Sequence, residues 1–152
     1  MKDLTVMERV WNILVIDDMP QLAGLVEKYS KLIDYNCQFR WASTMSRAEH
    51  EINLRQPHLI VLDLHMPGDT WKPSPQLAKE FGALTTLAFC KRIVTDPKLA
   101  KVAVILVSVD DQVRDLGKKA GAHGFYNKYD FTLERFEGIL QKLSVRYPLG
   151  TS

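Results

Sequence analysis

Three short apolar runs that do not alternate with polar residues limit most strongly what this chain can fold into. They span residues 11–16, 58–62 and 102–107, and each is rich in Val, Ile and Leu. A strand with one exposed face alternates, so continuous apolar runs of this length indicate strands covered on both faces, as in a parallel sheet. Residues 37–41 and 124–126 are weaker candidates for two further strands. The runs therefore predict a five-stranded parallel sheet.

Segments with helical spacing separate these runs. Apolar side chains recur at threes and fours over residues 22–33, 45–52, 84–93, 113–120 and 136–143. Pro20 is favoured in a first helical turn, and Gly121 is typical of the residue after a last turn. Ser46 and Glu49 have the spacing of a capping box at the start of the second helix. The order is β–α five times, which predicts helices on both faces of the sheet.

Length and composition agree with one soluble domain. The chain has 152 residues, of which 46% are hydrophobic and 25% charged, as in ordinary globular proteins. We expect a domain at residues 11–146, with an N-terminal extension at 1–10 and a C-terminal tail at 147–152. The net charge of +2 is too small to indicate a nucleic-acid or membrane partner. No apolar run approaches the ~20 residues that span a bilayer.

The two cysteines indicate in which kind of cellular compartment the protein lies. Cys37 and Cys90 lie far apart in the sequence, each among apolar residues, and they lack the spacing of metal ligands. We interpret them as buried, reduced thiols, which suit a reducing compartment. The sequence therefore predicts a cytoplasmic protein.

Polar side chains stand where the predicted strands end. Asp17 and Asp18 follow the first strand, Asp63 ends the third, Ser108 ends the fourth and Lys128 follows the fifth. The carboxyl ends of parallel strands meet at one edge of the sheet, where ligands of open α/β folds bind. Each residue alone has an ordinary explanation as a cap, a turn or a surface residue. Together they predict one site with three carboxylates, a hydroxyl and an ammonium group.

This set of groups suits phosphoryl transfer. Crowded carboxylates repel one another, and Mg²⁺ relieves that repulsion because it prefers oxygen ligands and typically binds one or two carboxylates plus a phosphate oxygen. An Asp beside the ion can attack phosphorus to form an acyl phosphate. Phosphoryl transfer otherwise needs positioning and charge neutralisation, which Mg²⁺, Lys128 and the Ser108 hydroxyl would supply.

Four stretches resemble the receiver domains of two-component response regulators. They read ILVIDD at residues 13–18, VLDLHMPG at 61–68, VILVS at 104–108 and GAHGFYNK at 121–128. The resemblance covers residues 11–146. It implies a flavodoxin-like (βα)₅ fold, a doubly wound parallel five-stranded sheet in three α/β/α layers. The first and fifth helices would cover one face and the other three helices the opposite face.

The resemblance assigns roles around a metal ion. Asp63 matches the phosphoacceptor of the family. Asp17 and Asp18 match the acidic pair that holds Mg²⁺, Asp18 more directly, with Asp63 as a further ligand. The backbone carbonyl of His65 falls where the family supplies another metal ligand. The cofactor implied is therefore Mg²⁺.

The resemblance also implies a switch. Ser108 and Lys128 match the hydroxyl and the lysine that contact the phosphoryl group, and Phe125 lies at the position of the switch aromatic, with Tyr126 beside it. In the family, the hydroxyl moves toward the phosphoryl group and the aromatic ring turns inward. This repacks the surface of the fourth helix, fifth strand and fifth helix, through which the chain could also form a homodimer.

The function implied is a stand-alone response regulator receiver of a two-component system or phosphorelay. A histidine kinase or histidine phosphotransfer protein would donate the phosphoryl group. The chain would catalyse its own phosphorylation and slow self-dephosphorylation, and would not be a turnover enzyme. One alternative is an interaction module of receiver fold that works without phosphorylation. Another is a hydrolase with an aspartyl nucleophile, although such enzymes often carry a second Asp where this chain has His65.

The chain departs from the family in two places. Tyr129 follows Lys128 where the family usually has a proline in a cis bond, and a non-proline cis bond costs ~2.5–4 kcal/mol, so we expect a trans bond. A loop at about residues 68–80 is inserted after the acceptor, longer than the usual connection of about 2–6 residues. Trp71 in this loop could lie over the acceptor site, dock a partner or pack back on the domain.

Overall fold

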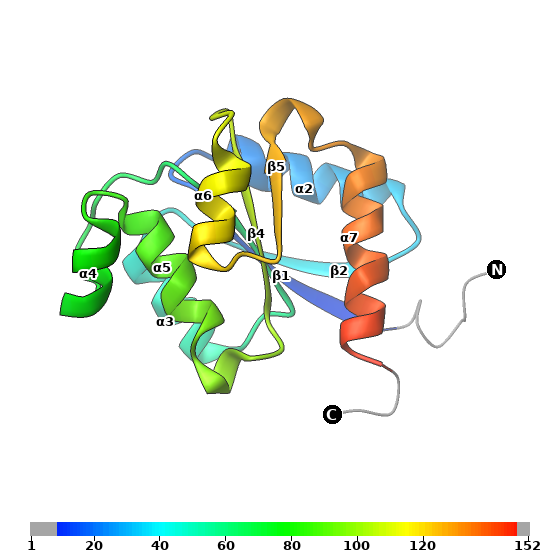
Figure 1. The fold of residues 1–152 in the computed structure, drawn as a ribbon. Coiled ribbons are helices and arrows are strands. Elements are labelled where there is room, and N and C mark those ends of the chain that lie inside the picture. The colour runs from blue at the N-terminus through cyan, green and yellow to red at the C-terminus, as the bar shows by residue number, and fades with distance from the viewer. Residues whose placement is uncertain (1–8, 149–152) are drawn as a thin grey trace.

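A single parallel sheet forms the centre of the molecule (Figure 1). The computed structural model describes residues 9–148. The strands lie in the order β2-β1-β3-β4-β5, which confirms the predicted flavodoxin-like sheet. The strands are β1 (Val10–Ile16), β2 (Asn36–Ala42), β3 (Leu59–Asp63), β4 (Ala103–Ser108) and β5 (Gly124–Asn127).

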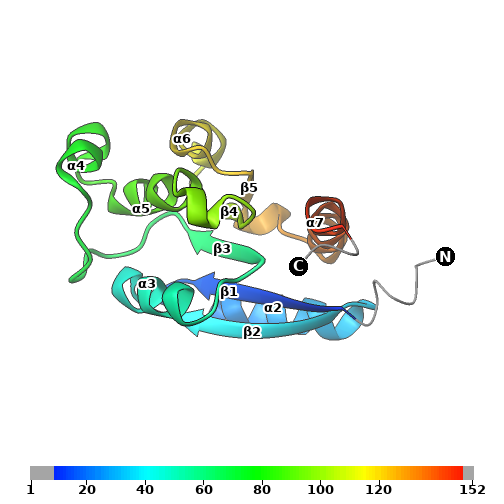
Figure 2. The same ribbon diagram turned by 90° about the horizontal axis from the view of Figure 1, so that it is seen from below.

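Helices cover both faces of the sheet (Figure 2). They are α2 (Gln21–Leu32), α3 (Met45–Leu54), α4 (Pro75–Phe81), α5 (Thr85–Val94), α6 (Val113–Ala120) and α7 (Leu133–Arg146), with short 3₁₀ turns η1 (Pro97–Leu99) and η2 (Lys128–Asp130). Buried residues of α2 and α7 form one core with the sheet, and those of α3, α5 and α6 form the other. This is the predicted division of the helices between the two faces.

The burial of the strands explains why their apolar runs do not alternate. Every residue of β3 and β4 is buried, and so is every residue of β1 after its first. The edge strands β2 and β5 are mostly half-buried or exposed, which is why their sequences gave weaker signals. No helix of the described residues 9–148 is long and apolar enough to cross a membrane. Residues 1–8 and 149–152, from the predicted extension and tail, lie outside the described part.

Two expectations about the helices were wrong. The β–α order holds, but α4 adds a helix inside the predicted loop at 68–80, begun by Ser74, whose hydroxyl accepts a hydrogen bond from the Leu77 amide. The cap of α3 is Thr44, whose Oγ1 accepts from the Arg47 amide at 3.0 Å, and not Ser46 of the expected capping box. The capping pattern fails because Ser46 is already the second residue of the helix.

The inserted segment packs back on the domain at two points. Asp69 accepts hydrogen bonds from the Met45 and Ser46 amides at 2.8 and 3.2 Å, so it binds the first turn of α3. The Trp71 ring meets the Phe89 ring of α5 edge to face, with centroids 4.9 Å apart. The segment therefore bridges α3 and α5.

Candidate functional site

Three carboxylates meet at the carboxyl edge of the sheet. Asp17 and Asp18 directly follow β1, and Asp63 is the last residue of β3. One oxygen from each lies within 4.8 Å of the others, a spacing that a single metal ion can bridge. Asp17 and Asp63 are buried, whereas Asp18 is exposed. The parallel pairing of β1 and β3 brings these residues together from 46 positions apart in the sequence.

Lys128 reaches the same edge from η2. Its Nζ lies 3.8 Å from Asp17 Oδ2. No cis peptide bond occurs in residues 9–148, so the bond between Lys128 and Tyr129 is trans, as we expected. The Asn127 side chain accepts a hydrogen bond from the Tyr129 amide at 3.0 Å and stabilises this turn. Lys128 therefore reaches Asp17 without the proline, and Tyr129 is 84% exposed.

The electrostatics around Asp17 fit a divalent cation. Burial is the main cause that raises the pKa of Asp17 to about 7, and the nearby Asp63 charge adds to it, against the Met19 amide and Lys128, which lower it. Asp17 Oδ2 is buried and accepts no hydrogen bond among the described residues. A buried carboxylate oxygen without a hydrogen bond is costly, and a cation would satisfy it. The residues present therefore fit Mg²⁺.

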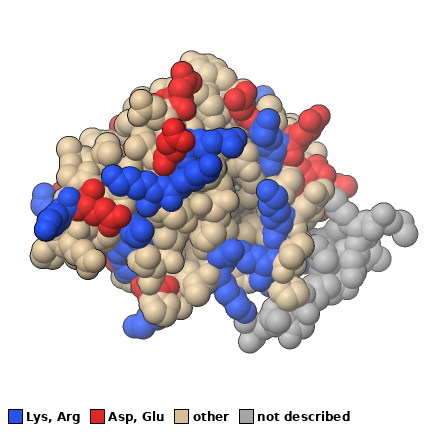
Figure 3. All heavy atoms as spheres, in the orientation of Figure 1, with Lys and Arg blue, Asp and Glu red and all other residues tan. Residues whose placement is uncertain are grey.

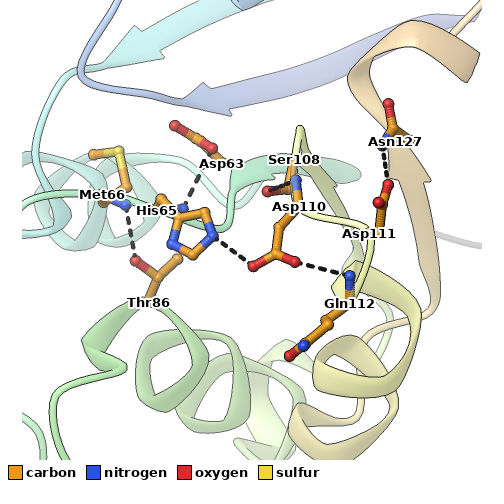
Figure 4. Close-up of polar contacts among 9 residues, drawn as sticks. All are labelled: Asp63, His65, Met66, Thr86, Ser108, Asp110, Asp111, Gln112 and Asn127. Carbon is orange, nitrogen blue, oxygen red and sulfur yellow. Dashed lines mark hydrogen bonds and ion pairs between the residues drawn. The ribbon is translucent and has the colours of Figure 1, made fainter.

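Side chains of the loops after β3 and β4 are in contact at the carboxyl edge of the sheet (Figure 4). His65 Nε2 lies 3.1 Å from Asp110 Oδ2, and the His65 amide donates to Asp63 Oδ1 at 3.3 Å. The Asp110 amide donates to Ser108 Oγ at 3.0 Å. A hydrogen bond from the Gln112 amide is the main cause that lowers the pKa of Asp110, and His65 adds to it. The bridge links the loop after β3 to the loop after β4.

Sequence reasoning missed two residues of this region. Asp110 lies two positions after Ser108, a spacing that could have suggested a loop residue near the acceptor. Thr86, at the start of α5, is buried, and its Oγ1 accepts a hydrogen bond from the Met66 amide at 3.2 Å. Nothing in the local sequence of Thr86 predicts this contact, which anchors the acceptor loop to α5.

The two aromatic residues of the predicted switch lie on opposite faces of β5. Phe125 packs against the core of α3, α5 and α6, and Tyr126 against that of α2 and α7. A β-carbon on Gly117 of α6 would lie 2.5 Å from Phe125 Cδ1, so the ring fills the space that this glycine leaves. Tyr126 contacts Phe131 with ring centroids 5.7 Å apart. Because successive side chains of a strand point to opposite faces, Phe125 and Tyr126 contact the two different cores of the domain.

The comparisons with known proteins bear on the fold. No model of a protein family and no curated protein matches the sequence. Among solved structures, the receiver domain of NtrX from Brucella abortus is 22% identical, with a TM-score of 0.64 over 86% of this chain and 96% of that one. The signal receiver domain of a histidine kinase from Syntrophus aciditrophicus is 20% identical, with a TM-score of 0.69 over 93% and 96%.

A third similar structure was solved with a metal ion bound. It is the response regulator Rcp1 in its Mn²⁺-bound form, 14% identical, with a TM-score of 0.61 over 93% of this chain and 97% of that one. The order of the strands, the division of the helices and the solved structures agree. The chain therefore has the fold of the response regulator receiver domains of two-component signalling.

Proposed function

We propose that this chain is a receiver that accepts a phosphoryl group on Asp63 in a Mg²⁺-dependent reaction. The donor is the phosphohistidine of a histidine kinase or of a histidine phosphotransfer protein. Phosphorylation then changes which partner the chain binds. Its chemistry is confined to its own phosphorylation and slow dephosphorylation, so it is not a turnover enzyme.

One observation carries the proposal. Carboxylate oxygens of Asp17, Asp18 and Asp63 lie within 4.8 Å of one another in a chain with the receiver fold. These three residues and the backbone carbonyl of His65 would hold the Mg²⁺ ion. When bound, Mg²⁺ neutralises charge on the phosphoryl oxygens.

The side chains of the site supply the rest of the reaction. An Asp63 oxygen attacks phosphorus, the new O–P bond forms as the P–N bond to the donor histidine breaks, and the electron pair leaves with the imidazole nitrogen. The Lys128 ammonium, already near Asp17, offsets negative charge on the incoming phosphoryl group. Because Ser108 Oγ accepts from the Asp110 amide, its own O–H is available to donate to a phosphoryl oxygen.

The switch would work through β4 and β5. A phosphoryl group adds charge and acceptor oxygens beside Ser108, and these favour the arrangement of the following loop that binds them best. Asp110 and His65 lie in the two loops that would move. Phe125 and Tyr126 carry the change to the helices on both faces.

Intact-mass measurement tests the proposal. Incubation with acetyl phosphate and Mg²⁺ should add one phosphoryl group, and EDTA should prevent it. Asp63→Asn should abolish the gain, whereas Asp34→Asn, the same change at an exposed position before β2, should retain it. An interaction module that works without phosphorylation predicts no gain in any of these samples. A gain that persists in Asp63→Asn would also contradict the assignment.

A further inference from the structure

The outer side of β2 offers unpaired backbone groups. β2 lies at one end of the strand order, next to β1, and forms an outer edge of the sheet (Figure 2). The Asp17 amide donates to the Ala42 carbonyl at 3.2 Å, so the backbone groups of Ala42 point toward β1. Because these groups alternate in direction along a strand, those of Cys37, Phe39 and Trp41 point away from the sheet. No strand in the described part of the chain pairs with them.

The side chains of β2 are apolar on one face and polar on the other. Cys37 and Phe39 pack against the core of α2 and α7, and Trp41, on the same face by alternation, is 46% exposed. On the opposite face Gln38 is exposed, and Arg40 is the only charged residue of the strand. Exposed aromatic surface beside unpaired backbone groups is what a strand of another chain can pair with.

A hollow beside β2 leaves room for the side chains of a second chain. Its volume is about 470 Å³, and it lies between α2 and β2, where Ala23, Gly24, Phe39 and Trp41 are among the residues that line it. A β-carbon at Gly24 would meet no atom within 4 Å, so the surface of the helix is open at this position. Helix α2 therefore does not close off the edge of the sheet.

Charge makes the other edge of the sheet less suited to a second copy of this chain. The other edge strand, β5, is next to α6 and α7, which together carry six lysine and arginine residues against three acidic ones. Lysine and arginine side chains gather over these two helices (Figure 3). Two copies that met through this face would bring like charges together, whereas each β2 contributes one positive charge.

We propose that two copies of this chain pair through β2, antiparallel and centred on Phe39, to form one continuous sheet. Cys37 then lies opposite Trp41 of the second copy, and the two Phe39 residues face each other. Such pairs exchange both of their hydrogen bonds in an antiparallel ladder, so the outward backbone groups of these residues are all satisfied. On the other face, Gln38 lies opposite Arg40.

The side chains favour this register over others. It sets aromatic side chains opposite apolar ones on the face of α2, and such cross-strand pairs stabilise a sheet. A register centred on Arg40 would instead place the two Arg40 side chains opposite each other, and like charges in that position are destabilising. Antiparallel pairing also puts the two Asp63 residues at opposite ends of the dimer. Both acceptor sites therefore stay open, and the pairing does not depend on phosphorylation.

Sedimentation equilibrium of the unphosphorylated protein tests the inference. The edge of one strand is a small interface, and interfaces below about 1,200 Å² associate weakly, so we expect a dissociation constant of about 10–100 µM. Gln38→Arg places like charges opposite both Arg40 side chains and should weaken the dimer about three- to ten-fold. Gln38→Glu places an opposite charge there and should strengthen it about two- to five-fold.

A matched control separates the two edges of the sheet. Gln141→Arg makes the same change of charge at an exposed position of α7 and should leave the dissociation constant within about two-fold. Gln38 and Gln141 are both exposed, so all three variants should fold, which circular dichroism checks.

Disulfide trapping tests the register. The Cα atoms of a hydrogen-bonded antiparallel pair lie about 5.5 Å apart, within the range of about 4.4–6.8 Å that disulfides span. Trp41→Cys should therefore cross-link to Cys37 of the second copy on oxidation and give a dimer on a non-reducing denaturing gel. Asn36→Cys has the same number of thiols, but this exposed position lies opposite Ala42, so the variant should remain a monomer on the gel.

Several results would overturn the inference. These are a monomer at about 1 mM protein, equal cross-linking of Trp41→Cys and Asn36→Cys, and equal weakening by Gln38→Arg and Gln141→Arg. Weakening by Gln141→Arg alone would place the interface on α7 and would overturn it as well.

Discussion

Replacing Asp69, a loop residue with four hydrogen bonds, should destabilise the chain. Its carboxylate accepts four hydrogen bonds, from the Met45 amide at 2.8 Å, the Ser46 amide at 3.2 Å, Ser46 Oγ at 2.7 Å and the Trp71 amide at 2.8 Å. Two of these donors are backbone amides of the first turn of α3, which have no partner within the helix. Asp69→Ala leaves all four donors without this acceptor.

The size of the effect follows from these contacts. Loss of a capping side chain costs about 0.5–2 kcal/mol, and a hydrogen bond to a charged group contributes about 1.5–3 kcal/mol. Asp69 is only half-buried, so water recovers part of the loss, and the four bonds do not add fully. We expect Asp69→Ala to lower the free energy of unfolding by about 2–4 kcal/mol. For a chain of this size, the melting temperature should fall by about 5–15 °C.

Urea unfolding followed by circular dichroism measures the change. Asp34→Ala, a substitution of the same residue type in the exposed turn before β2, is the control and should stay within about 0.5 kcal/mol of the parent. Limited proteolysis should also cut residues 68–80 faster in Asp69→Ala, because the segment loses its attachment to α3. Equal stability of the two variants would refute the reasoning, since the four hydrogen bonds would then contribute nothing.

The same residue gives a pH dependence. Burial alone would raise the pKa of Asp69, but hydrogen bonds from the Trp71 amide, Ser46 and the Met45 amide outweigh it and lower the pKa below its ordinary value of 3.8. The unfolded chain therefore takes up the proton first as the pH falls. The stabilisation is complete above pH 3.8 and is lost as the pH falls through the lower pKa of the folded state. Asp69→Asn should show less of this loss, and an equal loss would refute the assignment.

Three further predictions test other parts of the structure. Trp41 Nε1 donates to the Asp17 carbonyl at 2.7 Å, so Mg²⁺ should change the tryptophan fluorescence, and Trp41→Phe should abolish the change. Gly117→Ala should cost about 1–3 kcal/mol in urea unfolding, because its methyl group collides with Phe125. Burial is the main cause that lowers the pKa of His58 below its ordinary value of 6.5. The contribution of neutral His58 to the free energy of unfolding should therefore be complete above pH 6.5 and decline as the pH falls below it. His58→Gln should show a smaller decline.

Each of these has a matched control. Trp71→Phe should keep the change in tryptophan fluorescence on addition of Mg²⁺. Loss of this change in Trp71→Phe would contradict the role of Trp41. A β-carbon at Gly24 of α2 would meet no atom within 4 Å, so Gly24→Ala should raise the free energy of unfolding by up to about 1 kcal/mol. If Gly117→Ala raised it too, the predicted collision with Phe125 would be wrong. His50→Gln, the same substitution at an exposed histidine of α3, is the control for His58→Gln.

Some residues of the candidate site could be predicted from the ends of the strands in the sequence, and others could not. Asp17, Asp63 and Ser108 were found because each ends or follows a buried strand, and parallel strands bring such ends to one edge. Asp110 and Thr86 were missed because their partners, His65 and Met66, lie in a loop whose path no local pattern describes.

The sequence by itself determined the sheet and the position of the carboxylates. Continuous apolar runs must be buried on both faces, and this requirement selects parallel strands with helices on each side. The tertiary structure alone decided how the inserted segment is used. Asp69 lies 24 positions from Met45, and the hydrogen bond between them exists only because the loop after β3 passes the start of α3. Hydrophobic burial is repeated along the chain and is readable from it, whereas a single polar contact between distant loops depends on the path of the folded backbone.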